Sequence, residues 1–158
     1  MSKDKPTLPF HGKHSLPLRG KFPPVSVVMP VYNAAKYLPQ AVESILNQTY
    51  KDFEFIIIND GSYDSSWKII KKYSLIDKRI IAKQNPSNLG ICRTLNYGIS
   101  LAKGKYIARM DGDDWSYPER LSKQVSFMKK HSDVVICGGA IEVSDEKLKL
   151  IKVQKYPL

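Results

Sequence analysis

The sequence of 158 residues has only two cysteines, Cys92 and Cys137, and they are too far apart in the chain to form a close-spaced metal pair. We expect free, buried thiols in a reducing setting rather than a disulfide framework. No run of 18 uninterrupted apolar residues is present, which argues against a membrane-spanning helix. The first 24 residues also lack the apolar stretch of a secretory signal. These absences predict a cytoplasmic protein, either soluble or peripheral on the inner face of the membrane.

Acidic residues are scarce as well, because 15 Asp and Glu face 25 Lys and Arg, for a formal net charge of +10. This balance favours an anionic partner: nucleic acid, an acidic membrane or a phosphorylated substrate. A nucleic-acid module would need basic and aromatic residues interleaved on one exposed face. The aromatics Tyr32, Phe53, Phe55 and Tyr106 instead lie in or beside predicted strands. We therefore expect no nucleic-acid partner.

The positive charge begins in residues 1–24, which hold five of the ten prolines and five Lys or Arg against one Asp. This composition predicts an extended, disordered basic arm. Such an arm favours salt-sensitive contact with anionic membranes.

From Val25 onward the pattern is typical of one folded domain, residues 25–158. Apolar, β-branched runs predict strands at 25–32, 53–60, 106–111 and 134–143, and a weaker strand at 80–85. Helical spacing of apolar residues between them predicts helices near 38–46, 69–73, 95–102 and 121–128. Alternating strands and helices predict an α/β fold with a mainly parallel sheet covered on both faces. Ligands bind such sheets beyond the carboxyl ends of the strands.

Two acidic clusters follow predicted strands directly, NDGS at 59–62 and DGDD at 111–114. Carboxylates as close as Asp111, Asp113 and Asp114 repel one another unless a positive group lies between them. Asp111 and Asp113 suit a hard cation, Mg²⁺ or Mn²⁺, which would bridge to a diphosphate. Asp60 can accept hydrogen bonds from uracil or guanine, and Tyr32 can stack on the base. The clusters together predict a nucleotide-diphosphate site.

Five segments occur in the order and spacing of a known family: PVYN (30–33), NDGS (59–62), NLG (88–90), GKYIARMDGDDWSYPERL (104–121) and GGAIEV (138–143). From about Val25 to its end the chain resembles family 2 glycosyltransferases of the GT-A fold. The resemblance implies a three-layer α/β/α domain and an inverting transferase that uses a nucleotide sugar. It also implies a role in building bacterial lipopolysaccharide, capsule or other surface glycans.

The resemblance assigns roles to particular residues. It implies nucleotide-binding residues at Pro30, Tyr32, Asn33, Asp60, Asn88, Gly90 and Asp111. Asp113, with Asp111, is the expected ligand of Mn²⁺ or Mg²⁺. The expected partners are a UDP-sugar donor and a glycan or lipid-linked acceptor. Gly112 stands where many members have alanine, which makes the turn between the aspartates looser.

The catalytic residue stays unknown, because the family's general base and acceptor pocket are expected beyond Leu158. The domain is thus expected to be truncated at its C-terminus and to self-associate or recruit a partner polypeptide. One alternative is a truncated or split-gene module that binds nucleotide sugar without transferring it. A remote alternative is a haloacid-dehalogenase-like phosphatase. That class places its Asp-x-Asp motif on the first strand, followed by Thr or Val, whereas Asp114 and Trp115 follow here.

Overall fold

The computed structural model describes residues 22–144 and 150–154, so most of the predicted basic arm lies outside the described residues. The elements in chain order are β1 (Val25–Val31), α1 (Leu38–Leu46), β2 (Phe53–Asn59), α2 (Ser66–Ile76), β3 (Ile80–Gln84), α3 (Ile91–Leu101), β4 (Tyr106–Arg109), α4 (Arg120–Lys130), β5 (Ile141–Ser144) and β6 (Leu150–Gln154). None of these helices is long and apolar enough to cross a membrane.

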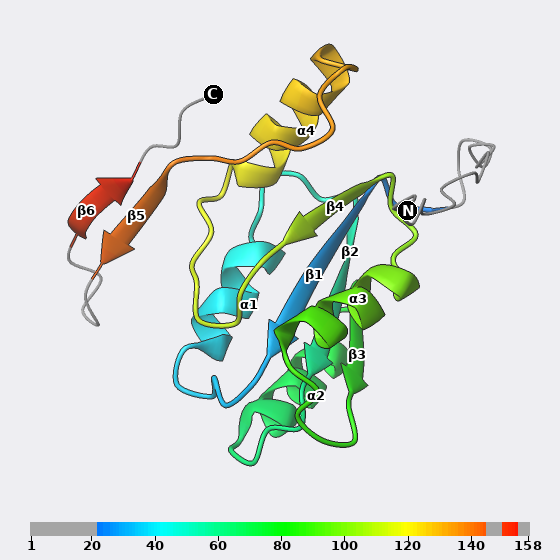
Figure 1. The fold of residues 1–158 in the computed structure, drawn as a ribbon, viewed down its shortest axis with the longest axis vertical. Coiled ribbons are helices and arrows are strands. Elements are labelled where there is room, and N and C mark those ends of the chain that lie inside the picture. The colour runs from blue at the N-terminus through cyan, green and yellow to red at the C-terminus, as the bar shows by residue number, and fades with distance from the viewer. Residues whose placement is uncertain (1–21, 145–149, 155–158) are drawn as a thin grey trace, which may run out of the picture.

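The main sheet is parallel, with strand order β3-β2-β1-β4 (Figure 1). Central β1 pairs with β2 on one side, Val25 opposite Phe53, and with β4 on the other, Val25 opposite Tyr106. The predicted strands at 25, 53, 80 and 106 and the mainly parallel α/β fold are therefore confirmed. Because the four strands run the same way, the loops that follow them meet at one edge.

Strands β1 and β2 are buried on both faces, which explains why they read as continuous apolar runs. Alternate residues such as Val27, Met29 and Phe55 face a large core built with helices α1, α2 and α4. The residues between them, including Val28 and Ile58, pack against α3 on the opposite face. The molecule thus has three layers, with α3 alone on its side of the sheet (Figure 1).

The strand predicted at 134–143 is wrong over most of its length. Val135 and Ile136 are 92% and 84% exposed, and regular structure begins only at Ile141. Strand β5 then pairs antiparallel with β6 in a separate two-stranded sheet (Figure 1). β-branched residues favour strands mainly where a neighbouring strand and a packed face exist, and Gly138 and Gly139 weaken the run further.

The two cysteines are free, as predicted, but they are not buried. Cys92 is exposed near the start of α3, and Cys137 is half-buried.

Helix α3 approaches the sheet closely through Gly98. A Cβ atom at this position would lie 2.5 Å from Cγ1 of Val28 and 3.5 Å from Cγ1 of Ile58. The glycine therefore sets the distance between helix and sheet, and with it the position of the loop at the N-terminal end of α3.

We expect Gly98→Val to lower the free energy of unfolding by about 1–3 kcal/mol, because the added methyl groups overpack this contact. Urea unfolding followed by circular dichroism measures the change. Ser100→Val, on the exposed side of the same helix, is the matched control for the helix propensity of valine. Equal losses in both variants would contradict the overpacking explanation.

Candidate functional site

Every residue predicted to bind nucleotide or metal lies in or next to a loop at the carboxyl edge of the sheet. The loops follow β1, β2, β3 and β4 and comprise residues 32–37, 60–65, 85–90 and 110–119. Hydrogen bonds over long sequence separations join the first loop to the second and the second to the third, as the contacts below show.

The first two loops brace each other through Asn33. Its backbone lies in the left-handed region at φ 50°, which asparagine tolerates better than most residues. The Asn33 N–H donates to Oγ of Ser62 at 3.0 Å, and its Oδ1 accepts from the N–H of Tyr63 at 3.1 Å. Its side chain therefore positions the second loop.

Asp64 joins the same two loops and lies just before the first residue of α2. Its Oδ2 accepts from the N–H of Ala35 at 3.0 Å, and its Oδ1 accepts from the N–H of Ser66 at 2.9 Å. Burial alone would raise the pKa of Asp64, but hydrogen bonds from Ser66 and Ala35 lower it below the ordinary value. The structure thus shows that Asp64 braces the two loops, a role that the sequence did not predict.

Two tyrosines project from these loops. Tyr32 is 47% exposed and Tyr63 is 85% exposed. Their rings meet edge to face, with centroids 6.1 Å apart and planes at 88°. The Tyr32 ring thus remains accessible to a planar ligand, while Pro30 lies half-buried at the end of β1.

Asp60 connects the second loop to the third loop and to α3. It is only 3% exposed, and its carboxylate accepts from Nδ2 of Asn85 at 2.7 Å and from the N–H groups of Leu89 at 2.9 Å and Gly90 at 3.0 Å. Asn85 also donates to Oγ1 of buried Thr94 at 2.9 Å. Burial alone would raise the pKa of Asp60, but hydrogen bonds, chiefly from Asn85 and Leu89, lower it below its ordinary 3.8.

The glycine after Asp60 lets the third loop approach. Gly61 has φ 68°, and a Cβ there would lie 2.4 Å from the carbonyl carbon of Ser87 and 2.5 Å from the nitrogen of Asn88. Oδ1 of Asn88 accepts from the N–H of Gly90 at 3.0 Å. The structure thus brings the loop of Asn88 and Gly90 beside Asp60.

The aspartate cluster lies in the fourth loop. Asp111 forms a two-pronged ion pair with Arg109, at 2.8 Å from Nη2 and 3.1 Å from Nε. Asp113 is exposed, and Asp114 is accessible to solvent but partly surrounded by protein. Partial burial, and then the charges of Asp111 and Asp113, raise the pKa of Asp114, while Arg120 and Arg109 oppose that rise.

The donor set fits a hard divalent cation that completes its shell with ligand oxygens, because Asp111 and Asp113 offer only carboxylate oxygens. Gly112 between them is buried against Val31, so the turn is held against the sheet. Within residues 22–144 and 150–154, no three His, Cys, Asp or Glu side chains converge to hold a metal by themselves. The arrangement suits a metal shared with a diphosphate, not a closed protein site.

The fourth loop is tied to α1 by Gln48, which sequence patterns did not single out. Gln48 is fully buried; its Nε2 donates to the carbonyl oxygen of Tyr117 at 2.7 Å and to Oγ of Ser116 at 3.2 Å. Its Oε1 accepts from the N–H of Leu121 at 3.0 Å. No sequence signal distinguishes this glutamine from a surface residue.

Sequence patterns also missed Asn85. This residue directly follows β3, just as Asp60 directly follows β2, so the rule that ligands bind beyond the carboxyl ends of parallel strands could have indicated it.

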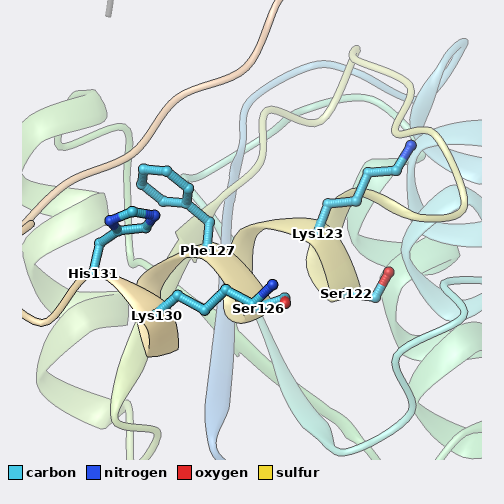
Figure 2. A pocket seen from close by; sticks show the side chains of 6 residues that line it. All are labelled: Ser122, Lys123, Ser126, Phe127, Lys130 and His131. Atoms are coloured by element: carbon cyan, nitrogen blue, oxygen red, sulfur yellow. The ribbon is translucent and has the colours of Figure 1, made fainter.

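A hollow along α4 is a different surface (Figure 2). Its lining is Ser122, Lys123, Ser126, Phe127, Lys130 and His131. None of the predicted site residues contributes to it, so the candidate site is the carboxyl edge.

Comparison with known proteins gives concordant findings. Residues 26–157 match the family model described as Glycosyl transferase family 2. The putative glycosyltransferase EpsE of Bacillus subtilis (strain 168) is 44% identical over 125 residues, 78% of this chain and 45% of the relative. The uncharacterized glycosyltransferase MJ1057 of Methanocaldococcus jannaschii is 44% identical over 139 residues, 85% of this chain and 48% of the relative. The chain thus spans less than half the length of these curated relatives.

Solved structures show the same fold. Residues 1–349 of S. aureus TarS match with a TM-score of 0.63 and 27% identity, over 68% of this chain and 33% of that one. The complex of this TarS fragment with UDP-GlcNAc gives a TM-score of 0.64 at 24% identity, over 76% and 40%. A Pyrobaculum calidifontis mannosyltransferase with GDP-Man and Mn²⁺ gives 0.63 at 20% identity, over 80% and 37%.

The Asp60 network predicts a pH-dependent loss of stability. Because its pKa is lowered on folding, the carboxylate stabilises the fold above pH 3.8, and this contribution is lost as pH falls through the lower folded value. Asp60→Asn should therefore lower the free energy of unfolding by about 1–3 kcal/mol near pH 7. The difference from wild type should shrink below about pH 4. Urea titrations across pH, with exposed Asp133→Asn as control, measure it; a pH-independent difference would contradict the assignment.

Proposed function

Since the chain belongs to glycosyltransferase family 2, we propose that the carboxyl edge of its sheet binds the nucleotide-sugar donor, a UDP-sugar, for transfer to a glycan or lipid-linked acceptor. One observation carries the proposal. Asp60 joins the loops that follow β2 and β3, and it does so at the same edge of the sheet as the aspartate cluster. A buried hydrogen-bond acceptor and a metal-suited carboxylate pair thus share one rim of the sheet.

In this proposal the base lies between Tyr32 and the loop 88–90. Tyr32 offers an exposed aromatic face for stacking. Asp60 accepts hydrogen bonds from Asn85, Leu89 and Gly90 and also interacts with the Thr94 hydroxyl, so a base would contact it by replacing one of these internal donors. Asn33, Asn88 and Gly90 shape the loops around it.

The diphosphate lies at the fourth loop, where Asp113 and Asp111 would hold Mn²⁺ or Mg²⁺. The Arg109–Asp111 ion pair does not prevent this, because both side chains are partly exposed, 56% and 36%. Exposed pairs of this kind contribute about 0.2–1 kcal/mol, so a divalent cation can displace the guanidinium. The bound metal supplies charge neutralisation for the departing diphosphate.

The proposed reaction inverts the anomeric centre. A base removes the proton of an acceptor hydroxyl, the oxygen bonds to the anomeric carbon, and the bond to the diphosphate breaks with its electron pair leaving on UDP. No side chain of the described residues is assigned as that base. The acceptor is proposed to belong to lipopolysaccharide, capsule or another surface glycan, with the protein on the inner face of the membrane.

We expect UDP binding to require a divalent metal, because the cation links the diphosphate to the two carboxylates. Calorimetry with UDP, with and without Mn²⁺, measures this, and GDP titrations test the choice of base. Asp113→Asn should remove the metal-dependent part of the affinity and leave the circular dichroism spectrum unchanged. Asp133→Asn makes the same charge change at an exposed position of another segment and should behave as wild type. Equal UDP affinity with and without metal would count against the proposal.

The base contact of Asp60 is tested separately. Asp60→Ala should weaken UDP binding by about 1–3 kcal/mol, the cost of leaving a buried hydrogen-bonding group of the ligand unpaired. Ribose 5-phosphate lacks the base, so its loss of affinity in the variant measures only the disturbance of the loops that Asp60 braces. A larger loss for UDP than for ribose 5-phosphate supports the base contact, whereas equal losses mean that Asp60 acts on the loops and not on the base.

A further inference from the structure

Two aromatic side chains of the fourth loop remain without a role in this scheme. Trp115 and Tyr117 follow the aspartate cluster directly and are 47% and 51% exposed. Their rings meet edge to face, with centroids 4.7 Å apart and planes at 74°. We refer to these two residues as the aromatic pair.

The backbone that carries the aromatic pair is firmly anchored. Ser116, between the two aromatics, is 3% exposed, and its N–H donates to Oγ of Ser44 at 3.1 Å. The buried side chain of Gln48 donates both to Ser116 and to the carbonyl oxygen of Tyr117. The carbonyl oxygen of Pro118 accepts from the N–H of Thr49 at 2.8 Å. The aromatic rings are therefore exposed on a fixed loop, not on a frayed one.

The Tyr117 side chain is also held at its hydroxyl group. The hydroxyl of Tyr117 donates to Oε2 of Glu142, in β5, at 2.5 Å. The Tyr117 side chain is thus held at its backbone by Gln48 and at its hydroxyl by a surface hydrogen bond to Glu142. A ligand that packs on the pair would thus meet a preformed surface, which lowers the entropic cost of binding.

The aromatic pair and the aspartates before it indicate the class of ligand. Exposed aromatic faces gain from covering an apolar face, while the carboxylates of Asp113 and Asp114, which directly precede the pair in the chain, can only accept hydrogen bonds when ionised. A pyranose ring offers both features, since one face presents C–H groups and the rim presents hydroxyl donors. A nucleotide base has no need of this surface, because Tyr32 provides a separate aromatic face after β1.

We propose that Trp115 and Tyr117 form a subsite for a pyranose ring. The inference rests on the proposed function, in which Asp113 lies at the diphosphate and the sugar nearest to it belongs to the donor or to the acceptor. Both sources share the chemistry described above, and binding experiments separate them.

Fluorescence of Trp115 tests the proposal directly. The sequence has two tryptophans, so Trp67→Phe leaves Trp115 as the single emitter. The donor arm compares UDP with UDP-glucose, UDP-galactose and UDP-GlcNAc in the presence of Mn²⁺. The acceptor arm titrates the methyl glycosides of the same three sugars, with and without UDP. We expect a sugar-bearing probe in one arm to change Trp115 emission beyond the change that UDP and Mn²⁺ cause without the sugar.

Affinity measurements use variants of the pair. Trp115→Ala should lower the affinity for the responding sugar probe by about 3- to 10-fold, the size expected for loss of one aromatic contact. UDP affinity should not change, and Trp115→Phe, which keeps a stacking face, should retain most of the sugar affinity. Tyr97→Ala removes another exposed tyrosine, on α3, and should have no effect.

The outcomes separate the two proposals. If UDP binds but no sugar-bearing probe alters Trp115 emission beyond the change that UDP and Mn²⁺ cause, the subsite is wrong and the proposed function stands. The subsite is also wrong if Trp115→Ala and Tyr97→Ala lose sugar affinity equally. If UDP itself does not bind, the proposed function is contradicted, and the methyl glycoside titrations, which need no nucleotide, still decide the subsite.

Discussion

The carboxylate of Asp60 joins parts of the chain that are 25 to 30 residues apart. It lies at the end of β2 and accepts hydrogen bonds from Asn85, just after β3, and from Leu89 and Gly90, just before α3. These contacts are buried, where a hydrogen bond to an ionised group is strong and its loss leaves several unpaired donors. The close packing of α3 through Gly98 fixes the other end of the same unit. The nucleotide side of the proposed site therefore depends on this one carboxyl group.

The proposed metal side of the site is also held by one buried side chain, in this case an uncharged one. Gln48 is buried at the end of α1 and uses both its amide nitrogen and its amide oxygen to hold the loop that follows the aspartates. The aspartate side chains make few such contacts, the exposed pair between Asp111 and Arg109 being the main one. The fourth loop thus combines a rigid backbone with accessible carboxylates. A site that receives a metal and a charged ligand needs both properties.

Much of the fold can be predicted from the sequence, because β1 and β2 are buried on both faces and leave an unmistakable apolar pattern. The rule that ligands bind beyond the ends of parallel strands also locates Asp60 and the aspartate cluster from the sequence alone. The strand predicted at 134–143 is wrong before Ile141, because apolar composition does not reveal whether a partner strand exists. Gln48 was missed, since its importance comes from long-range contacts that no local spacing encodes. The motifs singled out Asn33 and Asp60 as nucleotide-binding residues, which stays a prediction, but they did not indicate the hydrogen bonds that give both residues bracing roles.

The loops of the carboxyl edge are held mainly through backbone groups of their partners. Asp60 accepts from the N–H groups of Leu89 and Gly90, Asp64 accepts from that of Ala35, and Gln48 contacts the main chain at Tyr117 and Leu121. At Ala35, Leu89, Tyr117 and Leu121 a side chain can therefore be exchanged without loss of the brace, whereas Gly90, at φ 85°, resists replacement. An inserted or deleted residue would move the backbone group out of reach. These loops are thus open to most substitutions and closed to changes in length.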